Sequence, residues 1–392
     1  MAEGPAQGNK AGLRPLDQIL VVSLEQAIAA PLCTRHLADL GARVIKVERP
    51  GRGDFARDYD QRARGMASHF VWVNRSKESL ALDLKNPAHL QVLRALVARA
   101  DVLVQNLVPG ATARMGLDAA TLRQGRPELI VCDISGYGQD GPYRDRKAYD
   151  LLIQGESGLI SVTGSADAPA KAGNSMADIA AGMYAYSAIL AALMQRQRTG
   201  QGSHIDVSML ESLVEWMGYP MYYAMDGAPP PARTGASHAT IQPYGPYATG
   251  DGVAVILGVQ NEREWLRFCA QVLGRPELAT DSRFDTVAKR GEHVQALNDL
   301  ILQAFSQLDI GQVERRLDEA QIAHARMNSM ADVWAHPQLR ARQRWTTVES
   351  PSGLLPTLKP PASQSAFEPR LGPIPGVGQH NEAILKELGM QL

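Results

Sequence analysis

The stretch ILVVSLEQAIAAPLCTRHLADLGARVIKVE, residues 19–48, decides the fold class. Its first six residues, 19–24, are an almost continuous apolar run of the kind that forms a buried strand. We predict a helix over Pro31–Leu40, because proline is well tolerated in a first helical turn. A glycine ends this helix, and residues 42–48 read as a second strand. A strand, a helix and a strand in this order are typical of a doubly wound parallel sheet in an α/β protein.

The same alternation continues along the chain. An amphipathic helix is predicted over Asn86–Ala100 and a short one over Leu117–Gln124, with strands at 101–107 and 128–135. Ligands of such sheets gather at the carboxyl ends of the strands. The loops at those ends are rich in glycine and proline, and they span residues 48–54, 105–116 and 135–145.

Changes in composition along the chain indicate where its domains begin and end. We expect a large α/β domain over residues 16–225 and a smaller α+β domain over 240–330, which opens with a hairpin. Three further segments complete the division: a flexible leader (1–15), a linker rich in proline, glycine and alanine (226–239), and a return segment that packs on the large domain (331–392).

The overall charge of the chain is almost balanced, with 40 Lys and Arg against 41 Asp and Glu among 392 residues. This balance argues against nucleic acid or an anionic membrane as a bulk partner. No uninterrupted apolar run approaches the ~20 residues that span a bilayer, and the first residues lack the apolar segment of a secretory signal. Three cysteines stand far apart, which fits a reducing compartment. A cytoplasmic protein is therefore expected.

Common catalytic motifs do not explain this sequence. GYGQDG (136–141) matches the dinucleotide pattern GxGxxG, but Pro142 follows where a helix should open. The motifs GxSxG, HExxH and GxxxxGK[ST] are absent, which argues against α/β-hydrolase, zincin and P-loop chemistry. The nine histidines are scattered without the spacing of metal ligands. We predict neither a metal site nor a tightly bound cofactor.

Basic residues follow several predicted strands. Arg49, Arg52, Lys77 and Arg114 lie at or near strand carboxyl ends. A ligand that carries phosphate would need fixed cations at this edge of the sheet. Solvated surface charges would give the same pattern, so the cations by themselves leave both readings open.

Asp178 is the only acid in the apolar, alanine-rich stretch Ala170–Gln195. As a helix N-cap it would contribute about 1 kcal/mol, and the helix end would also keep its carboxylate ionised. A poorly hydrated carboxylate can attack an acyl centre if water is kept out. The neighbouring small residues, Ala177 and Ala180–Gly182, leave room for a ligand to approach. A cap has a second oxygen, so both roles are compatible.

Several segments together resemble one known family, the class III coenzyme A transferases (CaiB/BaiF), which also contains α-methylacyl-CoA racemases. The segments are LADLGARVIKVERPGRGD (37–54), NRSKESLALDLK (74–85), DVLVQNLVPGATARMGLD (101–118), MADIAAGMYA (176–185) and PGVGQHNEAILKELG (375–389). The resemblance implies an interlocked homodimer, in which each large domain is built from both chain ends. It also implies coenzyme A as cosubstrate, with an acyl-CoA and a small carboxylic acid as partners.

The resemblance also implies roles for individual residues. Asp178 matches the nucleophilic aspartate of the transferases. Four residues match positions that hold the nucleotide end of CoA: Arg49, Lys77, Arg114 and Met115.

Tyr149 separates the two activities of the family. The racemases also have an acid at the position of Asp178. At the position of Tyr149, however, they have a histidine, which is their second acid–base group. A tyrosine, with an ordinary pKa near ~10, is a poor partner for two-way proton transfer at neutral pH. Formyl-CoA transferases have a tyrosine here and a lysine two residues earlier, as this chain has Lys147. CoA transfer is therefore favoured, with α-proton transfer as the alternative and non-catalytic acyl-CoA binding as a third reading.

Two departures from the formyl-CoA transferases argue against formate or oxalate as the acid that this protein uses. Ile28 stands where formyl-CoA transferases have glutamine, and residues 233–247 lack their glycine cluster. The chain looks closer to the itaconate, mesaconate or citramalate CoA-transferases, which use succinyl-CoA. A dicarboxylic acceptor needs an anchor for its distal carboxylate, for which the candidates are Arg75, Arg233 and His238.

Overall fold

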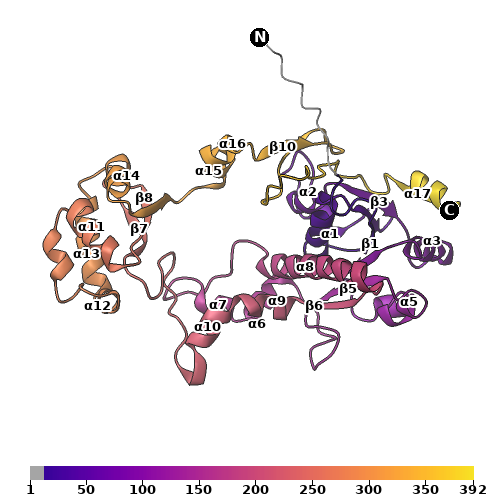
Figure 1. Cartoon of the computed structure of the whole chain (residues 1–392), viewed down its shortest axis with the longest axis horizontal. Coiled ribbons are helices and arrows are strands. Elements are labelled where there is room, and N and C mark those ends of the chain that lie inside the picture. Colours follow the sequence, from indigo (N-terminus) through magenta and orange to yellow (C-terminus); the bar gives the residue numbers. More distant parts are fainter. Residues whose placement is uncertain (1–12) are drawn as a thin grey trace, which may run out of the picture. The chain divides into compact units, whose positions relative to one another are not determined.

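The computed structural model describes residues 13–392 (Figure 1), so residues 1–12 of the predicted leader lie outside the described part. The chain divides into two compact units. The first unit contains residues 13–157, Ala172–Met217 and Gln338–Leu392. The second contains Gly158–Lys171 and Gly218–Pro337. Segments from both halves of the chain therefore build the first unit.

A six-stranded, wholly parallel sheet forms the centre of the first unit, with the strand order β3-β2-β1-β4-β5-β6. The strand order reverses between β1 and β4, as in doubly wound sheets, and the predicted α/β class is confirmed. The strands are β1 Leu20–Leu24, β2 Arg43–Glu48, β3 Lys77–Ala81, β4 Val102–Gln105, β5 Ile130–Ser135 and β6 His204–Ser208.

Helices cover both faces of this sheet. On one face α3 (Pro87–Val97), α5 (Ala119–Gly125) and the C-terminal α17 (Asn381–Leu388) pack on alternate strand residues in one apolar core. On the other face α1 (Ala29–Asp39) packs against α8 (Met176–Thr199), which also contacts β5 and β6 (Figure 1). The other elements of this unit are η1 Phe55–Asp58, α2 Ser68–Val73, α4 Ala111–Arg114, α6 Asp150–Glu156, α9 Met209–Trp216, β10 Trp345–Val348 and β11 Leu355–Leu358, with α16 Pro337–Ala341 at its border.

The second unit is built on a three-stranded antiparallel sheet, β7-β8-β9. Its first two strands are the predicted hairpin, and aromatic residues such as Trp265, Phe284 and Phe305 fill a separate core. The elements are α7 Leu159–Val162, α10 Gly218–Tyr223, η2 Met225–Gly227, β7 Tyr244–Ala248, β8 Ala254–Gly258, α11 Glu262–Arg267, η3 Phe268–Val272, η4 Pro276–Thr280, α12 Val287–Glu292, α13 Val294–Phe305, α14 Ile310–Glu319, β9 Ala323–Arg326 and α15 Met330–Ala335.

Small residues let α8 lie very close to α1. A Cβ added at Gly182 would lie 2.6 Å from the Ala29 carbonyl oxygen and 3.3 Å from the Leu32 Cβ. Ala177, Ala180 and Ala181 are fully buried in the same helix. The prediction that these residues leave room for a ligand was therefore wrong, because helix α1 occupies that room.

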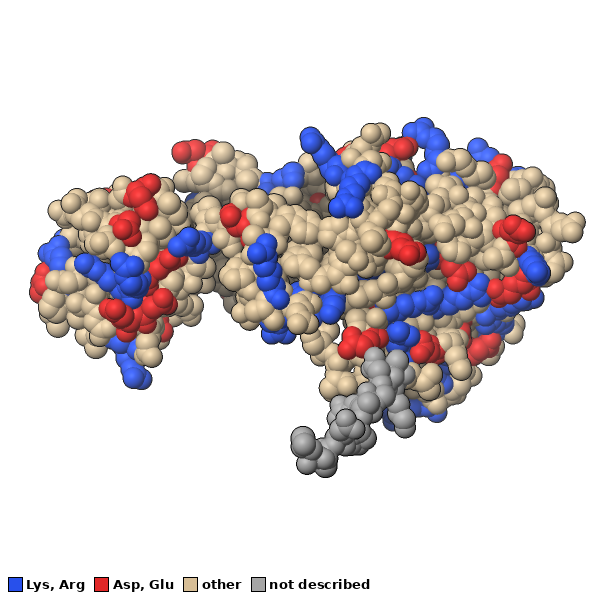
Figure 2. Space-filling model, turned by 90° about the horizontal axis from the view of Figure 1, so that it is seen from above, with Lys and Arg blue, Asp and Glu red and all other residues tan. Residues whose placement is uncertain are grey.

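Helix α8 is also the one helix within residues 13–392 whose length and apolar composition would suffice to cross a membrane. It packs against α1, α9, β5 and β6 with one side, whereas Met183, Tyr184 and Met194 are exposed. On the face of the molecule drawn in Figure 2, basic and acidic side chains are interspersed, as the balanced composition leads one to expect.

A cluster of four charged side chains is completely buried between the sheet and α1. The Lys46 ammonium lies 2.8 Å from Asp54 and 3.3 Å from Glu25, and the Lys77 ammonium lies 2.6 Å from Glu25. Asp54 in turn accepts a hydrogen bond from the Ala27 backbone N–H at 3.1 Å. The cluster therefore fixes the turn that leads into α1.

Replacing Gly182 by alanine should destabilise the protein, although alanine is the better helix former by about 1 kcal/mol. The added methyl group meets the α1 backbone, and such overpacking costs about 1–3 kcal/mol. Gly155 in α6 is the matched control, because a Cβ there has nothing within 4 Å and Gly155→Ala should be neutral or stabilising. The measurement is the urea concentration at the midpoint of unfolding for each variant and for the wild type. Equal midpoints for the two variants would contradict the close α1–α8 contact.

Candidate active site

Asp178 is the third residue of α8, whose N-cap is Ser175. The Ala177 and Asp178 backbone N–H groups donate to Asp150 Oδ1, at 2.8 and 3.2 Å. Asp150 is the first residue of α6 and comes 27–28 positions earlier in the chain. The predicted N-cap role of Asp178 was therefore wrong, because Asp150 accepts these N–H groups.

The Asp178 carboxyl group faces the start of α1. The pKa of Asp178 is raised to about 7, chiefly by burial and then by the charge of Asp150, while a hydrogen bond from the Ala29 backbone N–H acts in the opposite direction. The expectation that the helix end keeps this carboxylate ionised was therefore wrong. Desolvation and a like charge outweigh the helix end, so both protonation states are populated near neutral pH.

Apolar and phenolic side chains lie near this carboxyl group, which is itself partly exposed. Ile28 is buried at the start of α1 and packs in a small apolar cluster with Leu32 and Val73, against which Ile179 also packs. The Tyr59 hydroxyl interacts electrostatically with Asp178 and Tyr149, and burial raises its pKa to about 12. Tyr59 therefore remains a neutral hydrogen-bond donor at physiological pH.

Tyr149 and Lys147 lie close in sequence to Asp150 on the exposed segment before α6. The Tyr149 side chain is 67% exposed, and Lys147 is exposed as well. Neither makes a side-chain hydrogen bond or ion pair with a residue in the described range 13–392. Both side chains are therefore available to a ligand on the Asp178 side of the first unit.

A cavity of about 550 Å³ opens at the carboxyl ends of β1, β2 and β3. Its apolar floor is formed by Leu24, Val47, Leu82, Leu84 and Leu107, and its polar lining includes Arg49, Lys85, Glu48 and Asp83. Leucine and valine suit the faces of a flat ring, while the two cations suit phosphate. Lys85 was not predicted, although its position just after β3 could have suggested it.

Arg114 and Met115 lie beyond β4 on the same edge of the sheet. Arg114 ends α4 with an exposed side chain, which forms no ion pair with any residue from 13 to 392. The Met115 side chain packs against the core beneath α3. Arg114 is thus placed to meet an anion, whereas Met115 supports the loop that carries it.

Two predicted ligand-binding cations are instead buried in the protein. The Lys77 ammonium donates to Glu25 Oε1 at 2.6 Å, to the Pro31 carbonyl at 2.9 Å and to Asn74 Oδ1 at 3.0 Å. These three bonds use all the hydrogens of the ammonium group. The structure therefore leaves Lys77 no hydrogen to donate to a phosphate.

Arg75 is similarly engaged. Its guanidinium binds both oxygens of Asp39, at 2.8 and 2.7 Å. It also donates to Thr357 Oγ1 and to the Leu358 carbonyl, both at 2.8 Å. Arg75 thereby ties β11 to α1, and this role accounts for its charge without a substrate.

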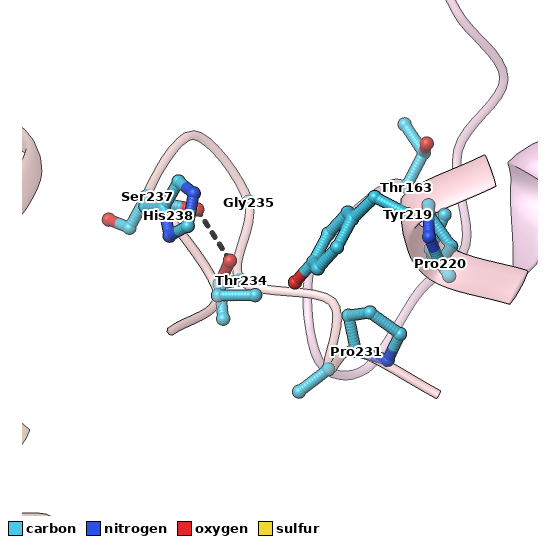
Figure 3. Close-up of a pocket in the computed structure, with 11 residues that line it drawn as sticks. Thr163, Tyr219, Pro220, Pro231, Thr234, Gly235, Ser237 and His238 are labelled. Carbon is cyan, nitrogen blue, oxygen red and sulfur yellow. Dashed lines mark hydrogen bonds between the residues drawn. The ribbon is translucent and has the colours of Figure 1, made fainter. Parts of the chain in front are cut away.

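Arg233 and His238 belong to the second unit. The Arg233 guanidinium donates to the carbonyls of Ser165 and Ala166, each at 3.0 Å, and so joins two segments of that unit. His238 is partly buried and lines a separate cavity of about 280 Å³. Of the three predicted anchors for a distal carboxylate, only His238 lines a cavity (Figure 3), and its Nε2 has no hydrogen-bond partner within residues 13–392.

Removing the charge of Asp150 should lower the pKa of Asp178. In Asp150→Asn one carbonyl oxygen still accepts the α8 N–H groups, but the like charge that raises the pKa is gone. Carboxyl ¹³C NMR should therefore show Asp178 titrating below about 7.

Asp150→Ala is the companion variant for this measurement. It removes the cap as well as the charge, so it should also cost about 1 kcal/mol in unfolding free energy. An unchanged Asp178 titration in Asp150→Asn would contradict the placement of the two carboxyl groups.

Comparison with known proteins agrees with this architecture. Residues 16–381 match the family described as CoA-transferase family III. The succinate–glutarate CoA-transferase of Agrobacterium fabrum is 36% identical over 95% of this chain and 96% of its own length. The succinyl-CoA–D-citramalate CoA-transferase of Chloroflexus aurantiacus is 34% identical over 96% and 94%. The crystal structure of a CaiB/BaiF family protein from Brucella suis superposes with a TM-score of 0.84 at 35% identity, covering 96% of this chain and 99% of that one. The chain is therefore an enzyme that belongs to CoA-transferase family III.

Proposed function

We propose that this enzyme transfers coenzyme A from succinyl-CoA to a small dicarboxylic acid, such as itaconate, mesaconate, citramalate or glutarate. The observation that carries the proposal is the Asp178 carboxyl group, desolvated at the start of α1 with a pKa raised to about 7. The names of the similar enzymes from Agrobacterium and Chloroflexus support succinate as the donor acid and a dicarboxylate as the acceptor.

In the first half-reaction an Asp178 carboxylate oxygen attacks the thioester carbonyl of succinyl-CoA. The carbon–sulfur bond breaks, CoA leaves as a thiolate, and a mixed anhydride joins Asp178 to succinate. The thiolate then attacks the aspartyl carbonyl carbon, which releases succinate and leaves an Asp178–CoA thioester. Poor hydration of the carboxylate favours this attack, because little water must be removed from the nucleophile.

The second half-reaction runs through the same steps in reverse with a new acid. A carboxylate of the acceptor attacks the Asp178 thioester, the thiolate leaves, and a second mixed anhydride forms. The thiolate attacks the acceptor's carbonyl carbon, which yields the new acyl-CoA and restores the Asp178 carboxylate. The Ala29 N–H, which already bonds the Asp178 carboxyl group, can stabilise negative charge that develops on its oxygen.

The nucleotide end of CoA is proposed to bind in the cavity at the carboxyl ends of β1–β3. Arg49 and Lys85 line that cavity and can pair with phosphates, while its leucine side chains cover the adenine ring. Arg114 on α4 is a further cation of the same sheet edge. Lys77 is left out of this proposal because its ammonium is fully occupied.

Racemisation of a 2-methylacyl-CoA is the alternative that the same aspartate could serve. It needs a second acid–base group, and the exposed Tyr149 stands at the candidate position. A phenol is poorly matched to proton transfer in both directions at neutral pH. The interlocked homodimer and the cytoplasmic location remain predictions that accompany the proposed transferase.

Asp178→Asn should abolish CoA transfer, with a loss on the order of 10³-fold or more, because the amide cannot form the anhydride. The measurement is the appearance of acceptor-CoA from succinyl-CoA, followed by mass spectrometry, with glutarate and itaconate as acceptors. In the wild type the rate should rise with pH through about 7, as the Asp178 carboxyl group ionises.

The same preparations separate the alternatives. Near-normal turnover in Asp178→Asn would refute the anhydride scheme. Exchange of the α-hydrogen of a 2-methylacyl-CoA in D₂O, without any acceptor acid, would instead favour the racemase.

Arg49→Gln should raise KM for succinyl-CoA roughly tenfold, since a lost charge-assisted bond to phosphate is worth about 1.5–3 kcal/mol. The effect should vanish with succinyl-pantetheine, which lacks the nucleotide. Arg52→Gln is the matched control, because Arg52 is exposed and paired with Asp58 at 2.7 Å. Equal losses for both thioesters would show that Arg49 does not bind the nucleotide.

A further inference from the structure

Asp150 lies directly beside the candidate nucleophile and is held there by three hydrogen-bond donors. Its Oδ1 accepts from the Ala177 N–H at 2.8 Å and from the Asp178 N–H at 3.2 Å. Its Oδ2 accepts from Gln154 Nε2 at 2.6 Å. All three partners are N–H groups, which suit an ionised carboxylate because such a group can only accept. A negative charge is therefore fixed against the backbone of the residue that carries the reacting carboxyl group.

Gln154 is the side chain that fixes Asp150. It lies four residues further along α6, a spacing at which glutamine and aspartate interact on a helix, and it is fully buried. Its Nε2 also donates to the Asn174 carbonyl at 3.2 Å, and its Oε1 accepts from the Ala172 N–H at 2.9 Å. One amide group thus joins Asp150 to the segment that leads into α8, so Asp150 cannot move away from Asp178 freely.

The charge of Asp150 acts on Asp178 without compensation. Of the charged side chains in residues 13–392, only Asp150 shifts the pKa of Asp178 appreciably, and it does so by repulsion. The Tyr59 phenol also interacts with Asp178, but it is neutral because burial raises its pKa to about 12. Two like charges that are close together and only partly hydrated repel each other. The ionised form of Asp178 is therefore destabilised relative to every form that carries no charge.

We propose that Asp150, held in place by Gln154, favours formation of the covalent intermediate by repelling the ionised Asp178 carboxylate. The inference rests on the proposed function, because it concerns the Asp178–CoA thioester of that scheme. Asp150 acts through Asp178, and Gln154 acts through Asp150. Both are therefore positioning residues.

The charge balance of the first half-reaction shows how the repulsion is relieved. The Asp178 carboxylate and succinyl-CoA become the Asp178–CoA thioester and succinate. The carbon–sulfur bond of succinyl-CoA breaks, and a new one forms at the aspartyl carbonyl carbon. One oxygen of Asp178 leaves with succinate and takes the negative charge with it. The second half-reaction returns an oxygen and the charge from the acceptor acid, so the effect cancels over a complete cycle.

The thioester and the protonated carboxyl group are both neutral, so the charge of Asp150 repels neither. The repulsion that raises the pKa of Asp178 therefore favours the thioester by the same factor. Each unit of pKa corresponds to about a tenfold change in an equilibrium constant. Removing the charge should shift both equilibria equally, whereas a purely structural role of Asp150 would not link them.

Asp150→Asn tests this link at equilibrium. Wild type and variant are mixed with succinyl-CoA and excess succinate at a pH of about 8.5, well above the Asp178 pKa of about 7. The samples are quenched in acid, and intact-protein mass spectrometry measures the ratio of protein with covalent CoA to free protein. This ratio should fall in Asp150→Asn by about tenfold for each unit by which the Asp178 pKa falls in the ¹³C NMR titration.

Two further variants separate charge from structure. Glu156→Gln is the matched control, because it removes a negative charge from the same helix at an exposed side chain, which lies 3.8 Å from Arg146. It should leave both the ratio and the Asp178 pKa unchanged. Gln154→Leu keeps the charge of Asp150 but removes its tether, so it should lower both quantities in the same direction by a smaller factor.

The outcomes distinguish this inference from the proposed function. Equal ratios in wild type and Asp150→Asn would overturn the inference and keep the transferase. So would a ratio that falls in Asp150→Asn and in Glu156→Gln alike, because position on α6 would then not matter. A wild type that never carries covalent CoA would refute the transferase scheme, and the inference with it.

Discussion

The contact between α1 and α8 is the constraint on which the candidate active site depends. Gly182 allows the α8 backbone to approach the Ala29 carbonyl, and this approach brings the first turn of α8 to the start of α1. Asp178 in that turn consequently meets the Ala29 N–H and is only partly exposed to water. Helix α1 connects the paired strands β1 and β2, so the sheet determines its position. The contact of α8 with α1 therefore determines where the Asp178 carboxyl group lies.

The fold class could be predicted from the sequence because the evidence for it is local. Apolar runs mark β1 and β2, Pro31 and Gly41 mark the ends of α1 between them, and the structure has all three elements within two residues of the predicted bounds. The cap of α8 could not be predicted in this way. Its acceptor, Asp150, is 27–28 residues away from the groups that it binds, and an acid near a helix start looks the same whether or not it is the cap.

The basic residues show a second limit of sequence reasoning. A lysine near a strand end is equally compatible with a ligand site and with a buried ion pair. Lys77 proved to be buried against Glu25, whereas Arg49 and Lys85 line a cavity at the sheet edge. The difference lies in which acids the fold brings near each cation, and Glu25 is 52 positions from Lys77. The sequence made His238 a candidate anchor for a distal carboxylate, but the hydrogen bonds from the Thr240 and Ile241 N–H groups to its Nδ1 depend on backbone geometry that only the structure shows.

The buried cluster of Glu25, Lys46, Asp54 and Lys77 has a consequence for how the sequence can change over time. Two negative and two positive side chains neutralise one another in the interior, so losing any one leaves a lone buried charge. Breaking a buried pair in this way costs about 3–5 kcal/mol, which is a large share of a domain's stability. Single substitutions at these four positions are therefore strongly disfavoured. Replacement requires simultaneous changes that keep the buried charges balanced. A designer who wishes to recode this part of the enzyme must change the four together.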